Sequence, residues 1–505
     1  MKKAKGVVAA GHELTAKAAE EILEDGGNAF DACVAGLYMT FVAEAVFASP
    51  GGGGFLMARR AGADRVTLLD FFAETPKRRC PERDIDFYPI QADFGPVKQE
   101  FHIGLGSSAT PGIVPGLFAM HAEFCRLPMQ RLAEPAIRAA RQGFPLSDFQ
   151  AYLFTVIAPI LTASPGVAEI FAPGGKLMQA GATFRNEDLA ECLAWLAEDG
   201  ARLFIDGDVG QTVIAQARER GGYLAEDDLK SYRLERRDPI LWRHHGSTVA
   251  LNPPPAASGA LVAFGLAYIE ALRNRGGIID ELVLMEAMEA TNAARAAHGE
   301  KLADILAIGG LKAAMQHAAR HPKSHRGTTH VSVIDADGNA AAASVSNGEG
   351  NGHIVGRFGF MLNNMLGEED LMPDGLGHWR ENLRLSSMMA PTIILGPDGS
   401  VTALGTGGSN RIRTAILQVV VNLLDLGVSI EDAVEAPRLH VEKCGAVSFE
   451  LGVGRAEQIL EVRPDAKLWP ERNLYFGGVH AARRLAKGRL EGAGDPRRRG
   501  HAIVL

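Results

Sequence analysis

The stretch HRGTTHVSVIDADGNA, residues 325 to 340, combines an alternating pattern, a turn signal and a pair of threonines. From residue 328 to 335 an alternating apolar run follows the two threonines, and a period of two predicts a strand. Asp337 and Gly338 predict a tight turn, and residues 340 to 345 predict a second strand. The stretch therefore predicts a β-hairpin that opens with two threonines.

Further helices and strands are predicted on both sides of this hairpin. Helices are expected at 14 to 24, 28 to 45 and 413 to 426, strands at 66 to 71, 393 to 395 and 401 to 405, and a mostly helical region with a strand-like piece, LNPPPAASG (251 to 259), between about 115 and 320. The basic segment HPKSHRG, 321 to 327, is expected to be an exposed loop. With no internal repeat or low-complexity linker, the pattern favours one large layered α/β fold.

The bulk composition is that of a globular protein with small-molecule partners. The 505 residues are 47% hydrophobic and 22% charged, which argues against a disordered or fibrous chain. The net charge of -8 gives no support for nucleic-acid binding, which needs basic patches. No apolar run reaches the roughly 18 residues of a membrane span. The N-terminal segment is a poor signal peptide, because its apolar stretch is short, and we expect a cytoplasmic protein.

Neither the cysteines nor the histidines predict a metal or a cofactor. The five cysteines show no CxxC spacing, and the histidines lack carboxylate or cysteine partners at ligand spacing. The glycines at 51 to 54 precede a predicted strand and fit neither phosphate-loop motif, so we expect tight turns and close backbone contacts there. No metal and no cofactor are therefore expected.

The threonine pair can be interpreted in two ways from local chemistry. Threonine is favoured in strands for its β-branched shape. A threonine hydroxyl also becomes a nucleophile when a base lies beside it, and its own α-amine, with a pKa of about 7.7 to 8.0, is such a base once the preceding bond is cut. The small Gly327 and the predicted loop before it suit that cut. The hairpin alone leaves both interpretations open.

Several short motifs, taken in order, resemble those of the gamma-glutamyltranspeptidases. They are GGNAFDA (26 to 32), GGGGFLM (51 to 57), SATPGIVPG (108 to 116), ARQGFPL (140 to 146), TTHVSVIDADGNA (328 to 340), GFMLNN (359 to 364), RLSSMMAPTI (384 to 393), GTGGSNRIRTA (405 to 415) and EAPRLH (435 to 440). The resemblance spans nearly the whole chain. It implies an N-terminal nucleophile hydrolase with an αββα sandwich, made as a proenzyme that cuts itself.

The resemblance also implies where the chain is cut and which residue is the nucleophile. The matching bond is Gly327-Thr328, which would give a large subunit of residues 1 to 327 and a small subunit of residues 328 to 505, intertwined in one fold. Thr328 aligns with the nucleophile, and Thr329 is its rival.

Further site residues follow by matching the family's motifs. Ser346 aligns with a hydroxyl residue that contacts the amine of the nucleophile, and Gly408 and Ser409 align with a Gly-Gly pair whose N–H groups stabilise the oxyanion. Ser386 and Ser387 align with two serines that grip the carboxylate of the donor.

Other positions depart from the family. Phe72 stands where the family has a carboxylate-binding arginine, a role that a phenyl ring cannot take. Met365 replaces a glutamine, and Glu368 lies near an acidic position that pairs with the donor's ammonium. Asn347 and Glu349 are candidate substitutes for a substrate-contacting asparagine. Alternative carboxylate clamps are Arg357, Arg384, Arg411 and Arg413.

Three functions are compatible with these residues. The first is a self-processing transferase or hydrolase that cleaves gamma-glutamyl amides such as glutathione and passes the acyl group to water or to an amino acid or peptide. The second, favoured by Phe72 and Met365, resembles the cephalosporin acylases of the family and cleaves an amide with another acyl group. The third is an unprocessed, inactive relative with a binding or structural role. A homo-oligomer is compatible with each of these functions.

Overall fold

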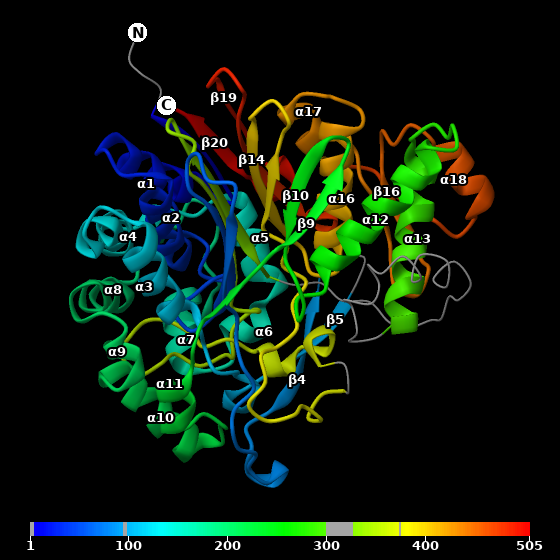
Figure 1. Cartoon of the computed structure of the whole chain (residues 1–505). Coiled ribbons are helices and arrows are strands. Elements are labelled where there is room, and N and C mark those ends of the chain that lie inside the picture. Colours follow the sequence, from blue (N-terminus) through cyan, green and yellow to red (C-terminus); the bar gives the residue numbers. More distant parts are fainter. Residues whose placement is uncertain (1–4, 94–97, 299–326, 373–374) are drawn as a thin grey trace.

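Two antiparallel sheets lie at the centre of the molecule (Figure 1). The computed structural model describes all residues except 1–4, 94–97, 299–326 and 373–374. The first sheet contains, in spatial order, β20 (His501–Val504), β1 (Gly6–Ala10), β11 (Thr329–Asp335), β12 (Ala340–Ser346), β2 (Gly53–Arg59), β3 (Val66–Phe71) and β8 (Glu235–Arg237). The second contains β19 (Leu490–Ala493), β18 (Gly478–Arg484), β14 (Val401–Gly407), β13 (Thr392–Leu395), β10 (Ser247–Leu251) and β9 (Ile240–His244).

The two faces of β11 have different neighbours because successive side chains in a strand point to opposite sides. His330 points toward the second sheet, where Gly405 of β14 leaves room for it: a Cβ on that glycine would lie 2.2 Å from the imidazole. Val331 points the other way and contacts Gly36 of the helical layer. The strand is thus buried on both faces, which places its first residues deep in the molecule.

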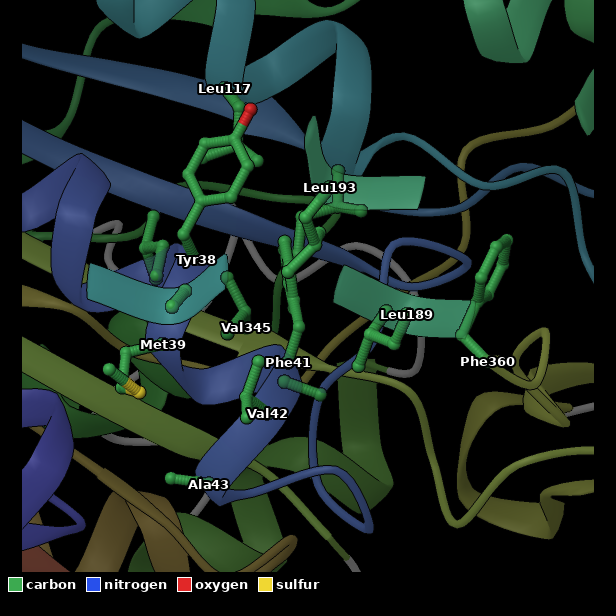
Figure 2. Close-up of a cluster of buried hydrophobic side chains, with 14 of the residues drawn as sticks. Tyr38, Met39, Phe41, Val42, Ala43, Leu117, Leu189, Leu193, Val345 and Phe360 are labelled. Atoms are coloured by element: carbon green, nitrogen blue, oxygen red, sulfur yellow. The ribbon is translucent and has the colours of Figure 1, made fainter. Parts of the chain in front are cut away.

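Helices cover the outer face of each sheet (Figure 1). On the first sheet lie α1 (Glu13–Glu24) and α2 (Ala29–Ala43), and every residue of α2 is buried, as expected for a helix that is apolar on all sides. Figure 2 shows side chains of α2 with Leu117, Leu193 and Val345 in one hydrophobic cluster. On the second sheet lie α12 (Ser258–Arg273) and α16 (Arg411–Leu424), with α13 (Glu281–His298) beside α12. The layers are therefore α, β, β, α, as expected.

The remaining elements surround this sandwich. The other helices are α3 (Ile113–Phe124), α4 (Met129–Gln142), α5 (Asp148–Val156), α6 (Ala158–Leu161), α7 (Pro165–Phe171), α8 (Glu187–Asp199), α9 (Arg202–Ile205), α10 (Asp208–Arg220), α11 (Glu226–Ser231), α17 (Ile430–Glu435) and α18 (Ala456–Val462). The other strands are β4 (Tyr88–Asp93), β5 (Lys98–Ile103), β6 (Phe144–Pro145), β7 (Thr183–Phe184), β15 (Leu439–Val441), β16 (Val447–Glu450) and β17 (Lys467–Trp469). Among the described residues, no helix combines the length and the apolar character that a membrane span requires.

Most of the predicted elements near the hairpin are confirmed, one is shifted, one is wrong, and one lies almost entirely outside the described residues. The helix expected at 413 to 426 begins and ends two residues earlier, as α16. The piece at 251 to 259 is not a strand, because β10 ends at its first residue and the chain then turns into α12. Residues 321 to 326 of the expected exposed loop lie outside the described residues, and Gly327, its last residue, is buried.

Segments before and after Gly327 share both sheets. The first sheet takes β1, β2, β3 and β8 from the earlier part of the chain and β11, β12 and β20 from the later part. The second takes β9 and β10 from the earlier part and β13, β14, β18 and β19 from the later part. The boundary at 327/328 remains a prediction, but any cut there falls between segments that pair in the same sheets.

Candidate active site

A pocket lies where four strands meet at one end of the sandwich. There β11 and β2 begin and β12 ends, because Thr329 pairs with Val345 and Ser346 pairs with Gly53. β14 also ends there, at Gly407, next to Thr328. The polar residues lining the pocket are Thr328, Ser346, Glu368, Ser387 and Ser409, and the backbone of Gly327 lines it as well. The apolar residues lining it are Phe72, Met365, Leu371, Met388, Met389 and Ile412.

Thr328 lies just before β11, and hydrogen bonds hold both its side-chain hydroxyl and its carbonyl oxygen. Its Oγ1 donates to the carbonyl oxygen of Gly327 at 2.8 Å, and its own carbonyl oxygen accepts from Nη1 of Arg498 at 3.0 Å. Gly407 at the end of β14 approaches so closely that a Cβ there would lie 2.0 Å from the Thr328 carbonyl oxygen. Burial lowers the pKa of Arg498 to about 10, so its guanidinium stays charged at neutral pH.

Ser346, the last residue of β12, donates its hydroxyl to the same Gly327 carbonyl oxygen, at 2.6 Å. Its position is fixed in turn by the backbone N–H of Gly348, which donates to the serine oxygen at 3.0 Å. In the uncut chain the nitrogen of Thr328 is a peptide nitrogen, and Ser346 contacts the carbonyl side of the Gly327-Thr328 bond. Two hydroxyls thus converge on the carbonyl oxygen of that bond.

Glu349 holds the other side of Gly327. Its Oε1 accepts the backbone N–H of Gly327 at 2.8 Å, and the glutamate is buried. Glu349 was a candidate substitute for a substrate-contacting asparagine, but its side chain contacts Gly327, the residue before Thr328. Arg498 was missed by sequence reasoning, and the run DPRRRG at 495 to 500 is the one signal that marked its neighbourhood.

The turn formed by Gly408 and Ser409 brings the N-terminus of α16 to the pocket. Gly408 has φ +131° and Ser409 has φ +52°, which is the left-handed region that disfavours side chains. The N-terminal end of a helix carries partial positive charge and unpaired N–H groups, which favour a developing anion. Ser409 therefore adopts the conformation that a glycine would take there, at some cost in backbone strain.

The structure brings two of the four predicted substrate residues to the pocket. Ser387 lines it, and Glu368 lies so close to Gly348 that a Cβ on this glycine would be 2.5 Å from Oε1. Ser386 instead donates to the carbonyl oxygen of Pro255 at 2.8 Å. Asn347 accepts from the hydroxyl of Ser49 at 2.8 Å, and neither Ser386 nor Asn347 is among the described residues that line the pocket.

Phe72, which stands where the family has a carboxylate-binding arginine, forms part of the pocket wall. Its ring stacks on Phe55 with 5.5 Å between centroids, and it is buried. Met365 lines the same wall. Among the described residues, no lysine or arginine side chain lines this pocket.

The four arginines proposed as substitute clamps have other partners. Arg384 donates to Asp70 at 3.1 Å, Glu74 at 2.8 Å and the Phe72 carbonyl oxygen at 2.8 Å. Arg413 donates to Asn292 at 2.7 Å, and Arg411 donates to the Tyr475 carbonyl oxygen at 3.1 Å. Arg357 lies over the ring of Trp195. None of them lines the pocket in the part of the chain that the structure describes.

Comparison with known proteins agrees with this geometry. The model of the family described as Gamma-glutamyltranspeptidase matches residues 15–505. The chain belongs to the gamma-glutamyltranspeptidase family. This family consists of N-terminal nucleophile hydrolases that act on small-molecule amides, with water or amino acids as acceptors, which fits a buried threonine in a pocket at the end of an αββα sandwich.

Relatives with two different names are similar to this chain. The glutathione hydrolase proenzyme of Escherichia coli is 28% identical over 86% of this chain and 80% of its own length. The acylase ACY 1 proenzyme of Pseudomonas sp. (strain V22) is 29% identical over 99% of this chain and 94% of its own length. In structure, the cephalosporin acylase from Bacillus halodurans superposes with a TM-score of 0.84 over 99% of this chain and 96% of its own, at 21% identity, which supports the fold.

Proposed function

We propose that this protein is a self-processing amide hydrolase whose nucleophile is the hydroxyl of Thr328. The observation that carries the proposal is the pair of hydroxyls, from Thr328 and Ser346, that converge on the Gly327 carbonyl oxygen at 2.8 and 2.6 Å. In the proposed step the Thr328 hydroxyl attacks the Gly327 carbonyl carbon, and the Ser346 hydroxyl polarises the carbonyl group. Both relatives named above are called proenzymes, which supports processing.

The processing step is an N to O acyl shift followed by hydrolysis. The Thr328 oxygen forms a bond to the Gly327 carbonyl carbon, and the negative charge that develops on the carbonyl oxygen is stabilised by the Ser346 hydroxyl. The carbon–nitrogen bond then breaks, and the Thr328 nitrogen takes the proton lost by the hydroxyl. Water cleaves the resulting ester, which leaves a carboxylate on Gly327 and a free hydroxyl and amine on Thr328.

The freed amine is the base for turnover. It accepts the proton of the Thr328 hydroxyl as the oxygen attacks the carbonyl carbon of an amide donor, and it returns that proton to the leaving amine. The N–H groups of the Gly408 and Ser409 turn, at the N-terminus of α16, stabilise the oxyanion. Water, or an amino acid or peptide amine, then takes the acyl group from Thr328.

The lining of the pocket favours a donor with an acyl group other than gamma-glutamyl. A gamma-glutamyl group brings a carboxylate into the pocket, and a buried carboxylate needs a cation or several donors. The described lining offers Ser387 for this purpose, while Phe72 and Met365 make the wall apolar. Arg384, which donates to the Phe72 carbonyl oxygen, is held by Asp70 and Glu74. We therefore propose an acylase-like donor preference.

Gamma-glutamyl transfer is the second candidate, and Ser387 and Glu368 favour it. A glutamate on the pocket wall can pair with the α-ammonium of a gamma-glutamyl donor. Glutathione hydrolysis would then persist with a weakened hold on the carboxylate. The two candidates share Thr328 and differ only in which acyl group is bound.

Two experiments test the proposal. A denaturing gel with N-terminal sequencing of the smaller fragment should find a chain that begins Thr-Thr-His-Val, and Thr328→Ala should stay full length. Anilides with gamma-glutamyl, glutaryl and unsubstituted short-chain acyl groups, compared by kcat/KM, identify the donor. A persistent full-length chain without turnover of any anilide would contradict the proposal and favour an inactive binding protein.

A further inference from the structure

We propose that Glu44 is a positioning residue that sets the nucleophile in place through Thr329, so that the second threonine of the pair is an anchor. The inference rests on the proposed function and adds a residue that none of the motifs contains. Glu44 lies directly after α2, in a different layer from the pocket, and 285 positions from Thr329 in the sequence.

The carboxylate of Glu44 is shared between two threonine hydroxyls. Its Oε2 accepts from Oγ1 of Thr329 at 2.5 Å, and its Oε1 accepts from Oγ1 of Thr15 at 2.8 Å. All three side chains are buried. Gly11 makes room for this arrangement, because a Cβ there would lie 2.5 Å from Oε2 of Glu44 and 2.8 Å from Oγ1 of Thr329. The hydrogen bonds of Glu44 to the two threonines are thus buried and closely packed against Gly11.

Thr329 lies on the face of the strand opposite to the pocket. Residues alternate along β11, so Thr329 points to the helical layer, as Val331 does, while Thr328 precedes it on the other side. Thr328 lines the pocket and Thr329 is not among the residues that do so in the described part of the chain. The two hydroxyls therefore cannot exchange roles without turning the strand over.

The start of β11 needs such an anchor because its backbone pairing is incomplete. On one side Thr329 pairs with Val345 of β12. On the other side the ladder to β1 ends with Ala10 opposite Val331, two residues short of Thr329. Beyond the end of that ladder, the hydrogen bond from Thr329 to Glu44 fixes the residue next to the nucleophile.

The segment that carries Glu44 also contacts the partner of Thr328. Arg498, which donates to the Thr328 carbonyl oxygen at 3.0 Å, has its guanidinium 5.4 Å from the ring centroid of Phe47. Desolvation raises the pKa of Glu44, and the two hydroxyls and the charge of Arg498 oppose that rise. The segment after α2, from Glu44 to Phe47, thus contacts both Thr329 and Arg498, which fix the backbone around Thr328. A displacement of about 1 Å at a reacting group lowers a rate by roughly 10²-fold.

Two matched valine substitutions separate positioning from stability. Thr329→Val and Thr15→Val each remove one hydroxyl from the same carboxylate and keep the side-chain shape. Both should lower the thermal unfolding temperature by a similar amount. Only Thr329→Val should slow cutting at 327/328 and lower kcat, by about 10- to 100-fold with KM within about threefold. Thr15→Val should cut and turn over within about threefold of the unaltered chain.

Two further variants complete the test. Thr329→Ser keeps the hydroxyl and should restore kcat to within about threefold. If Thr329→Val does not fold, Glu44→Gln takes its place, and loss of kcat at unchanged KM supports the inference. Unchanged kcat in the folded variant, or an equal loss of kcat in Thr15→Val, overturns the inference and leaves the proposed function standing. Absence of cutting and turnover in the unaltered chain overturns both.

Discussion

Replacing Ser346 with alanine should slow self-cleavage strongly and leave the protein folded. In the uncut chain the Gly327 carbonyl oxygen receives two hydroxyls, from Ser346 at 2.6 Å and from Thr328 at 2.8 Å. When the Thr328 oxygen attacks, its proton leaves and it stops being a donor. Of the two hydroxyls, that of Ser346 remains to stabilise the developing oxyanion.

The magnitude follows from the loss of one such donor. Removing a single donor to an oxyanion costs about 2.7 to 4 kcal/mol in activation free energy, which is roughly 10²- to 10³-fold in rate. We therefore expect Ser346→Ala to accumulate as the full-length chain under conditions where the unaltered chain is cut. The rate is measured by translating each variant in vitro, stopping samples at intervals and quantifying the two fragments on denaturing gels.

Ser346→Thr is the matched control because it keeps a hydroxyl at the same position in β12. It should be cut within about tenfold of the unaltered chain, the remaining loss coming from the extra methyl group in a packed site. Thermal unfolding of Ser346→Ala should show a folded protein. Cutting of folded Ser346→Ala within about threefold of the unaltered rate would refute this account of the carbonyl contact.

Three other predictions concern the pocket, the turn and a buried histidine. Phe72→Arg should raise kcat/KM for a gamma-glutamyl anilide at least about tenfold, since a hydrogen-bonded charge pair contributes about 1.5 to 3 kcal/mol, and no gain would count against the assigned clamp position. Ser409→Gly should raise the free energy of unfolding by about 1 kcal/mol, because glycine adopts φ +52° without strain; urea denaturation showing a loss would disprove it. Burial lowers the pKa of His480 from 6.5 to about 4, so the unfolded chain binds a proton that the folded chain does not, and stability falls as pH drops from 6.5 toward 4. At pH 5 this histidine should lower the free energy of unfolding by about 2 kcal/mol. Denaturation of the unaltered chain and of His480→Gln at pH 7.5 and pH 5 checks this, because the variant should lack that loss.

Local pattern was sufficient for the hairpin that follows Thr328 and for the helix packed on it. The hairpin of β11 and β12 was predicted because it alternates apolar and polar residues around an Asp-Gly turn, and α2 because its apolar residues recur at helical spacing. The strands β1, β18, β19 and β20 of the two sheets were missed, and so were β8, β9 and β10. β8 reads Glu-Arg-Arg and β9 is half exposed, so neither has the apolar alternation that marks a strand.

The site was predicted only in part, for a physical reason. Thr328, Ser387 and Ser409 lie in motifs that the sequence marked, Ser346 follows one of these motifs, and all four line the pocket. Ser386 was expected beside Ser387, but neighbouring residues in an irregular segment point in different directions, and Ser386 turns to Pro255. The orientation of each side chain there depends on tertiary contacts that a motif does not contain.

Contacts between distant segments escape sequence reasoning altogether. Arg498 reaches Thr328 across 170 positions, and Glu44 reaches Thr329 across 285. A lone glutamate after an apolar helix and an arginine in a basic run carry no local signal of their partners. The packing of α2 on the first sheet brings Glu44 to the hairpin, and the turn before β20, a strand of the same sheet, brings Arg498.

The shared sheets give a cut at residue 327 an unusual physical consequence. β1 would belong to one product and both of its neighbours, β11 and β20, to the other. The ladders between β2 and β12 and between β10 and β13 also cross the cut, so parting the products means breaking these four ladders of backbone hydrogen bonds. A nicked protein would therefore migrate as a single particle on a sizing column. Halves produced separately would have no finished surface to dock and would have to fold around each other.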